Sequence, residues 1–292
     1  MKGNTGIMCA AQNDAGASNE AADMSITPGS LFRAGRLEAA ITAANDSVRR
    51  APGVMEHRML LAELLLFAGR FERADTVLAT AETIDPSLML VASEFRHLLR
   101  AEIARQQTWR EGRVPEFVGE PTESLSLSLK ALTLAREGDE AGAAQAAQDA
   151  EAARPHVGGQ HEDTAFDDFR DADDICAGFI EVLTVTGRYF WMPTERIEEA
   201  IFHPARRPRD LFWRRCSMTV RAGPDGDVYV PAIYADTSAA ASSPDDTGAD
   251  ALRLGKSTEW SGEILVRGRG QRLFLAGDDG LAIQDLISLT FG

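Results

Sequence analysis

The chain has 292 residues, of which 44% are hydrophobic and 26% are charged, which is the composition of a soluble globular protein. Its formal net charge of −15 repels nucleic-acid phosphates and anionic membranes, so we expect neither nucleic acid nor a membrane as partner. The three cysteines are widely spaced and form no C-x-x-C pair, which argues against a disulfide framework or a zinc site and fits a reducing compartment.

Residues 1–24 are expected to form a disordered extension, because they are polar and rich in Gly, Ala and Asn. They contain no apolar core of the kind that a secretory signal needs. No apolar run elsewhere approaches the roughly 18 residues of a membrane span. We therefore expect a cytoplasmic protein. Met24 begins the segment with structural periodicity and is a second candidate for the start of translation.

An internal repeat organises residues 25–160. The segment Ala34–Glu38 matches Ala68–Glu72 at an offset of 34 residues, and a looser third copy begins at Arg136. Each copy has a Gly followed 17 residues later by a Pro: Gly35 and Pro52, Gly69 and Pro86, Gly138 and Pro155. This period is typical of the tetratricopeptide repeat, where Gly ends one helix and Pro stops the next. The sequence therefore predicts an α-α superhelix, with one long amphipathic helix at 88–103 where the repeat signature is lost.

Small residues stand where the paired helices of each repeat would cross. They are Ala40, Ala74 and Ala143, at equivalent positions in the three copies. A larger side chain at such a position would force the two helices apart, so we expect these alanines to be buried.

The second half, residues 161–292, changes to short β-branched and aromatic runs separated by turn residues. Strands are predicted at 180–186, 188–192, 218–221, 228–231, 262–266, 272–276 and 287–291. These spacings predict a small, mostly-β domain, built as a barrel-like, bent antiparallel sheet. Residues 238–251 lack large apolar side chains and are predicted to be a mobile insert. The fold class is therefore α+β, in two parts.

Several blocks of sequence resemble those of one protein family. They include FDDFRDADD at 166–174, GRYFWMPTERI at 187–197, RPRDLFWR at 207–214 and GQRLF at 270–274. Shorter matches lie at 61–65, 116–121 and 202–204, so the blocks cover nearly the whole chain after residue 31. Their joint order is specific, and by it the chain resembles the ImpE family, also called TagJ or SciE.

This resemblance implies a non-enzymatic accessory or adaptor protein of the bacterial type VI secretion system. It implies that the protein binds a helix of the small contractile-sheath subunit and assists sheath assembly or recycling by the AAA+ unfoldase. On the residues alone a different class stays open, namely a metal-dependent or hydrolytic enzyme in the β domain. Converging carboxylates in a pocket would favour the enzyme, and an apolar groove would favour the adaptor.

The residues with most potential for metal or catalytic chemistry do not form known motifs. The aspartates at 167–174 fail the EF-hand pattern, because Cys176 occupies its Gly position. His156 and His161 are separated by two glycines, so they do not share a helix as the ligands of a zinc protease do. We therefore predict no catalytic residue, no metal ligand and no cofactor.

A groove on the helical repeats is the first candidate surface for protein binding. The helix at 59–67 has apolar side chains on more than one side, so some of them are free to face a groove. The predicted contact residues are Leu61 and Leu65, with rim charges from Arg58 and Glu63. The alternative is a helix that is buried on all sides.

The arginine-rich stretch 206–221 is the second candidate surface. Arg and Trp are the residue types most enriched at interface hot spots. The predicted contact residues are Arg207, Arg209, Trp213 and Arg214. The alternative for these arginines is internal pairing with the acidic cluster at 167–174.

Overall fold

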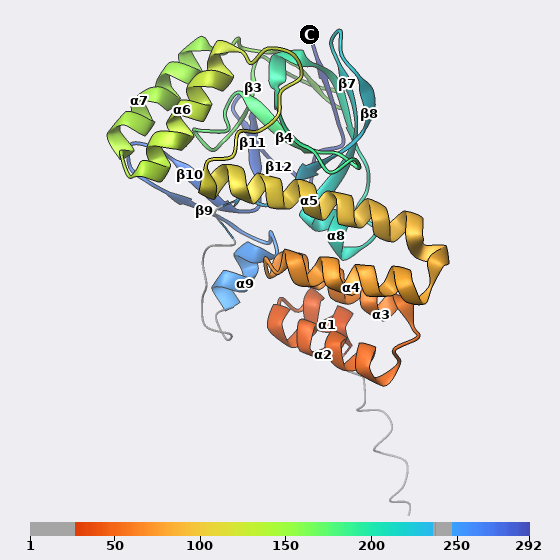
Figure 1. Ribbon diagram of the computed structural model, residues 1–292. Helices are drawn as coiled ribbons and strands as arrows, with labels where there is room; N and C mark the ends of the chain where they lie inside the picture. The colour runs from red at the N-terminus through yellow and green to blue at the C-terminus, as the bar shows by residue number, and fades with distance from the viewer. Residues whose placement is uncertain (1–26, 236, 238–246) are drawn as a thin grey trace, which may run out of the picture.

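The structure is a computed structural model that describes residues 27–235, 237 and 247–292 (Figure 1). The predicted extension at 1–24 and residues 238–246 of the predicted insert lie outside the described residues. The last residues of that insert belong to a helix, α9 (Thr247–Arg253). This helix packs onto the repeats, since the carboxylate of Asp250 accepts a hydrogen bond from the backbone N–H of Leu37 at 3.0 Å.

The first half of the chain is helical, as the repeat predicts. Three helix pairs follow one another, and a single 23-residue helix, α5, stands between the second and third pairs. The helices are α1 (Pro28–Arg33), α2 (Leu37–Arg50), α3 (Met55–Phe67), α4 (Phe71–Ile84), α5 (Met89–Glu111), α6 (Glu123–Glu137) and α7 (Glu140–Ala153), with a 3-10 turn η1 (Pro86–Leu88) before α5.

Local signals account for where these helices end. Gly35, Gly69 and Gly138 follow α1, α3 and α6, and each has a positive φ, of 78°, 66° and 81°. Only Gly takes this left-handed conformation without strain, so it closes the first helix of each pair. The prolines of the repeat stand just beyond α2, α4 and α7. The alanines predicted at the helix crossings are fully buried: Ala40, Ala74 and Ala143.

The second half is built around one bent antiparallel sheet. Eight strands are hydrogen-bonded in the order β2-β1-β13-β6-β7-β8-β4-β5, and β12-β11-β3 and β10-β9 form two smaller sheets. The strands are β1 (Gly159–His161), β2 (Thr164–Phe166), β3 (Phe169–Asp171), β4 (Phe179–Leu183), β5 (Tyr189–Pro193), β6 (Ile197–Phe202), β7 (Trp213–Val220), β8 (Asp225–Pro231), β9 (Thr258–Ser261), β10 (Arg267–Gly270), β11 (Leu273–Ala276), β12 (Asp279–Ala282) and β13 (Ser288–Phe291). Short helical turns precede β6 and β7, at η2 (Thr194–Arg196) and α8 (Pro208–Phe212).

The predicted α+β class and the bent sheet are confirmed, with two differences in detail. Within the described residues the sheet does not close into a barrel, because β2 and β5 remain at opposite ends of the strand order. The prediction of a strand at 262–266 was wrong, because these residues form the turn between β9 and β10. Gly262 has φ 90° there, and a Cβ at this position would lie 2.0 Å from the backbone oxygen of Leu265. Leu265 lies in this turn, and its apolar side chain is buried.

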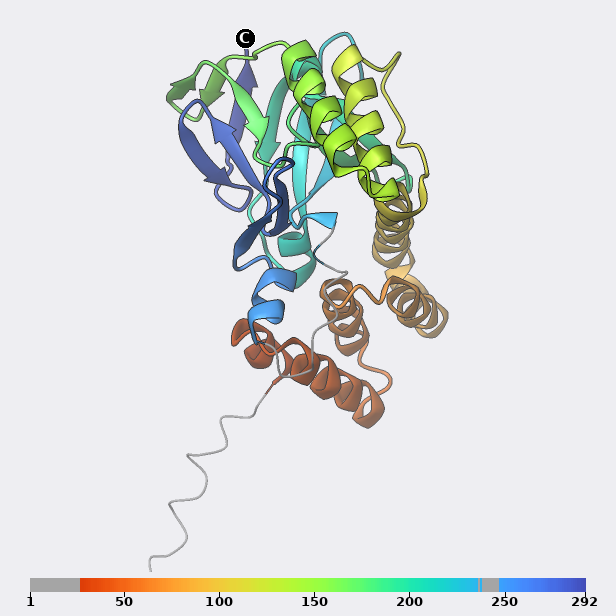
Figure 2. The same cartoon turned by 90° about the vertical axis from the view of Figure 1, so that its left-hand side faces the viewer.

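One hydrophobic core crosses the predicted boundary at residue 160. Phe67 of α3 packs against Phe212 of α8 with ring centroids 5.2 Å apart, and Phe95 of α5 packs against Trp213 of β7 at 5.9 Å. Both figures place α1–α4 at one end of the molecule and α6–α7 beside the β region, with α5 running between them (Figures 1 and 2). The helical repeats are therefore joined to the sheet by α5 and α8 rather than by a flexible linker.

Candidate functional site

The apolar residues predicted to line the helical groove lie inside the core. Leu61 and Leu65 are 3% and 0% exposed, and α3 packs against α2, α4 and α8. Neither side chain lines an open groove in this structure: the second half of α3, from Leu61 to Phe67, is buried on all sides, while Glu56 to Leu60 stay at least partly exposed. Arg58 is partly exposed, and its Nη2 donates to the backbone oxygen of Pro52 at 3.3 Å.

Glu63, the second predicted rim charge, is buried on α3 and only 4% exposed. Burial raises the pKa of its carboxyl to about 7, although Arg209 and Arg207 of the α8 region act to lower it. The carboxyl therefore holds its proton to much higher pH than an exposed glutamate. Its place is the packed contact between α3 and α8.

Two residues of the arginine-rich stretch have structural roles. The side chain of Trp213 is fully buried, and its Nε1 donates to Glu102 of α5 at 2.9 Å. Arg214 is 4% exposed and donates to the backbone oxygens of Ile283 and Leu286, at 3.0 and 3.1 Å. These contacts attach β7 to α5 and to the segment before β13, so neither side chain is open to a partner.

The acidic cluster at 167–174 pairs with arginines outside the 206–221 stretch. Arg154 donates to Asp168 at 2.7 Å, and Arg267 donates to Asp173 at 2.9 Å. The predicted alternative, in which the arginines at 206–221 neutralise this cluster, is therefore wrong for the described residues. Internal pairing does occur, but its partners come from the end of α7, from β10 and from Arg272 just before β11.

A buried charge cluster joins α5 to the sheet, and the sequence reading did not identify it. It consists of Glu102, Arg105, Asp171, Glu181 and Arg272, and each is at most 1% exposed. The carboxylate of Glu181 accepts from Arg105 Nε and Nη2 at 2.9 and 3.0 Å, and also from Arg272. Burial alone would raise the pKa of Glu181, but Arg105 and Arg272 hold it well below its usual range. Glu181 thus stays ionised between two buried guanidinium groups.

The other members extend this cluster along α5 to Glu102 and across to Asp171 of β3. Arg105 Nη1 donates to Glu102 at 3.1 Å, and Arg272 lies 3.2 Å from Asp171. Burial raises the pKa of Asp171 to about 7, in spite of Arg272. The sequence does carry one signal, because Glu181 interrupts the otherwise apolar β4 run FIEVL. A charge there is stable only if a partner is buried with it.

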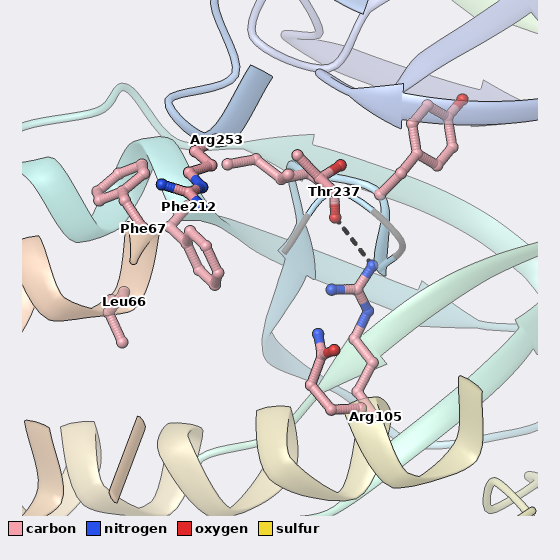
Figure 3. A pocket seen from close by; sticks show the side chains of 9 residues that line it. Leu66, Phe67, Arg105, Phe212, Thr237 and Arg253 are labelled. Atoms are coloured by element: carbon pink, nitrogen blue, oxygen red, sulfur yellow. Dashed lines mark hydrogen bonds between the residues drawn. The ribbon is translucent and has the colours of Figure 1, made fainter. Parts of the chain in front are cut away.

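The cavity beside this cluster is too small for a ligand. It lies between α3, α5 and α8, with Arg105 on one side and Phe67 and Phe212 on another (Figure 3). Its volume is about 10 Å³, room for about one water molecule at most.

A wider cleft lies beside the segment that leads into α8, and we call it the arginine cleft. It encloses about 590 Å³ and is lined by α5, the β4–β5 turn, the segment 203–210 and the β7–β8 hairpin. Predicted site residues Arg207 and Arg209 line it, together with Arg206 and Arg215. Arg206 and Arg207 are exposed at its rim, whereas Arg209 is buried on its floor.

Groups suited to metal binding are not assembled in the described part of the chain, although Ser217 Oγ lies 2.9 Å from His203 Nε2 and donates to Asp227 at 2.6 Å at the edge of the arginine cleft. No cluster of three or more His, Cys, Asp or Glu residues with metal-binding geometry occurs there. Cys176 and Cys216 are buried free thiols, and burial raises the pKa of Cys216 to about 12. Among the described helices, none has the length and apolarity required to cross a membrane.

Comparisons with known proteins agree with this architecture of helical repeats joined to an open, bent sheet. The sequence profile of the ImpE protein family matches residues 163–290. The chain is 31% identical over 261 residues to the type VI secretion system accessory component TagJ of Pseudomonas aeruginosa, covering 89% of each protein. It also resembles the crystal structure of protein VPA1032 from Vibrio parahaemolyticus, with a TM-score of 0.82, 27% identity, and coverage of 91% of this chain and 97% of the other. The chain belongs to the ImpE/TagJ family.

Proposed function

We propose that the protein is a non-enzymatic accessory protein of a type VI secretion system. In this role it binds a helix of the small contractile-sheath subunit in the cytoplasm and assists assembly of the sheath or its recycling by the AAA+ unfoldase. The observation that carries the proposal is the similarity to the TagJ accessory component over 89% of both chains. Helical repeats on a rigid β support are also an architecture that commonly presents a surface to a partner.

The test measures binding between the whole chain and the purified small sheath subunit of the same bacterium. The whole chain is required because Phe67 and Phe212 pack across the boundary between the helical and β regions. Isothermal titration calorimetry should show saturable binding to the intact subunit and none to a subunit that lacks its N-terminal helix. If the intact subunit gives no binding heat and does not co-elute with the protein, the proposal is wrong.

A further inference from the structure

The carboxylates that line the arginine cleft are already occupied by groups of the chain itself. Glu94 of α5 accepts from Arg209 Nη2 at 3.3 Å and from the Tyr229 hydroxyl at 2.9 Å. Asp227 of β8 accepts from Arg215 Nη2 at 2.5 Å. These acidic groups therefore do little to neutralise additional cations in the cleft.

Two further arginines are not neutralised in this way. Arg206 and Arg207 donate their backbone N–H groups to Asp210 at 2.8 and 3.2 Å, which fixes the chain at the start of α8. Their side chains are exposed, and Arg207 is near enough to the buried Glu63 to lower the pKa of its carboxyl. The residues that line the cleft include four arginines and three carboxylates, Glu94, Asp210 and Asp227, so the cleft carries a small net positive charge in a chain with a net charge of −15. It would attract an anionic group by charge complementarity.

Arg209, on the floor of the cleft, gives a second and independent observation. It is 7% exposed, and its Nε and Nη1 have no hydrogen-bond partner among the described residues. The Nε atom lies 3.9 Å from the carboxylate of Asp210. Both atoms are closed off from solvent, and the guanidinium lies over the Phe95 ring at 5.2 Å from its centroid, so Arg209 acts on the cleft through its positive charge rather than by offering these N–H groups to a ligand.

Exposed apolar side chains lie in the cleft and on the first turn of α5 beside it. Val91 and Val185 line the cleft, and each is 39% exposed. Met89 and Leu90 stand on the same turn of α5 and are 59% and 82% exposed. Such a run of exposed apolar side chains beside a charged rim is typical of a surface that binds another protein.

We propose that the arginine cleft docks an amphipathic helix with an acidic edge. Acidic side chains of this helix would face Arg206 and Arg207, and its apolar face would cover Leu90 and Val91. This assignment rests on the proposed function, because the occupant is the helix of the small sheath subunit. A helix with acidic and apolar side chains matches both the arginines and the exposed apolar side chains of this surface. A nucleic acid does not, because the overall negative charge of the protein repels it.

The test compares two charge reversals in the full-length protein. Arg206→Glu with Arg207→Glu should weaken binding of the small sheath subunit about tenfold or more in calorimetry. The matched control is Arg33→Glu with Arg36→Glu, two exposed arginines at the α1–α2 turn. Lys256 donates to the backbone oxygen of residue 33, which the substitution leaves in place. This control changes the net charge equally and should alter affinity by no more than about twofold.

Leu90→Asp tests the apolar contact of the proposed docking surface separately. A side chain that is 82% exposed contributes little to folding, so this substitution should leave stability unchanged. It should also weaken binding about tenfold, with an unchanged thermal midpoint. Wild-type affinity in both Leu90→Asp and the Arg206–Arg207 variant would overturn the cleft assignment while leaving the proposed function intact. Equal losses in the Arg33–Arg36 control would overturn it as well, because they would indicate a general charge effect. Absence of binding by the wild-type protein would overturn both proposals.

Discussion

Replacing Glu181 by Gln tests whether the buried charge cluster holds α5 against the sheet. The substitution keeps the size of the side chain and removes its charge. Glu181 accepts hydrogen bonds from Arg105, Trp109, Tyr189 and Arg272, all within the core. An amide has a single acceptor oxygen, and its NH₂ group would face guanidinium donors. Two buried guanidinium groups would therefore lose their shared counterion.

The expected magnitude follows from the burial of all partners. Removing one partner of a buried ion pair costs about 3–5 kcal/mol. Because Glu102 and Asp171 remain beside Arg105 and Arg272, we expect a loss near the lower end of this range, about 3 kcal/mol. The matched control is Glu116→Gln, which breaks the ion pair with Arg188 at the surface, where the side chains are 35% and 57% exposed. An exposed pair of this kind contributes less than about 1 kcal/mol.

Urea denaturation at neutral pH measures both free energies of unfolding. Because the folded pKa of Glu181 is depressed, its stabilising effect is present above the ordinary carboxyl pKa of 4.5 and is lost as the pH falls below it. The difference between wild type and Glu181→Gln should therefore shrink in acid. A Glu181→Gln variant as stable as Glu116→Gln at neutral pH would refute the account of the buried charge cluster.

Three other substitutions test separate parts of the structure. Ala74→Leu adds volume to a fully buried position of α4 and should lower the free energy of unfolding by about 1–3 kcal/mol; an unchanged thermal midpoint would contradict the close helix crossing. Glu63→Gln should gain stability relative to wild type as the pH rises from 4.5 to about 7, by up to about 3 kcal/mol, because burial raises the folded pKa of the wild-type carboxyl to about 7. Thermal melts at pH 5 and pH 8 measure that gain, and a difference independent of pH would contradict it. Gly138→Ala should cost about 1 kcal/mol in a urea titration, since Gly138 ends α6 with φ 81°; no loss would mean that the left-handed conformation is not required.

Local sequence signals predicted the helices well because their causes are local. Gly69 and Pro86 end helices through their own backbone properties, and the 34-residue period repeats those causes. The strand predicted at 262–266 failed for an equally local reason. Its apolar residues lie in a turn that Gly262 closes. Leu265 belongs to this turn, and its side chain is nevertheless buried in the core.

The candidate site depended on contacts that periodicity does not reveal. Arg105 and Glu181 are 76 residues apart in the chain, so their pairing follows from the packing of α5 on β4. Leu61 and Leu65 were predicted to face a groove because α3 has more apolar residues than one face needs. The additional face is covered by α8, from more than 140 residues further along the sequence. Only the tertiary fold distinguishes a buried helix from one that lines a groove.

Helix α5 connects the arginine cleft with the buried charge cluster. Its first turns supply Val91 and Glu94 to the cleft, and its later turns supply Glu102 and Arg105 to the cluster. Trp213, directly after α8, donates to Glu102 and so fixes α8 relative to α5. The cleft is therefore formed by elements that the core already holds in place. A partner helix would bind a preformed surface, with little ordering of the protein to oppose the association.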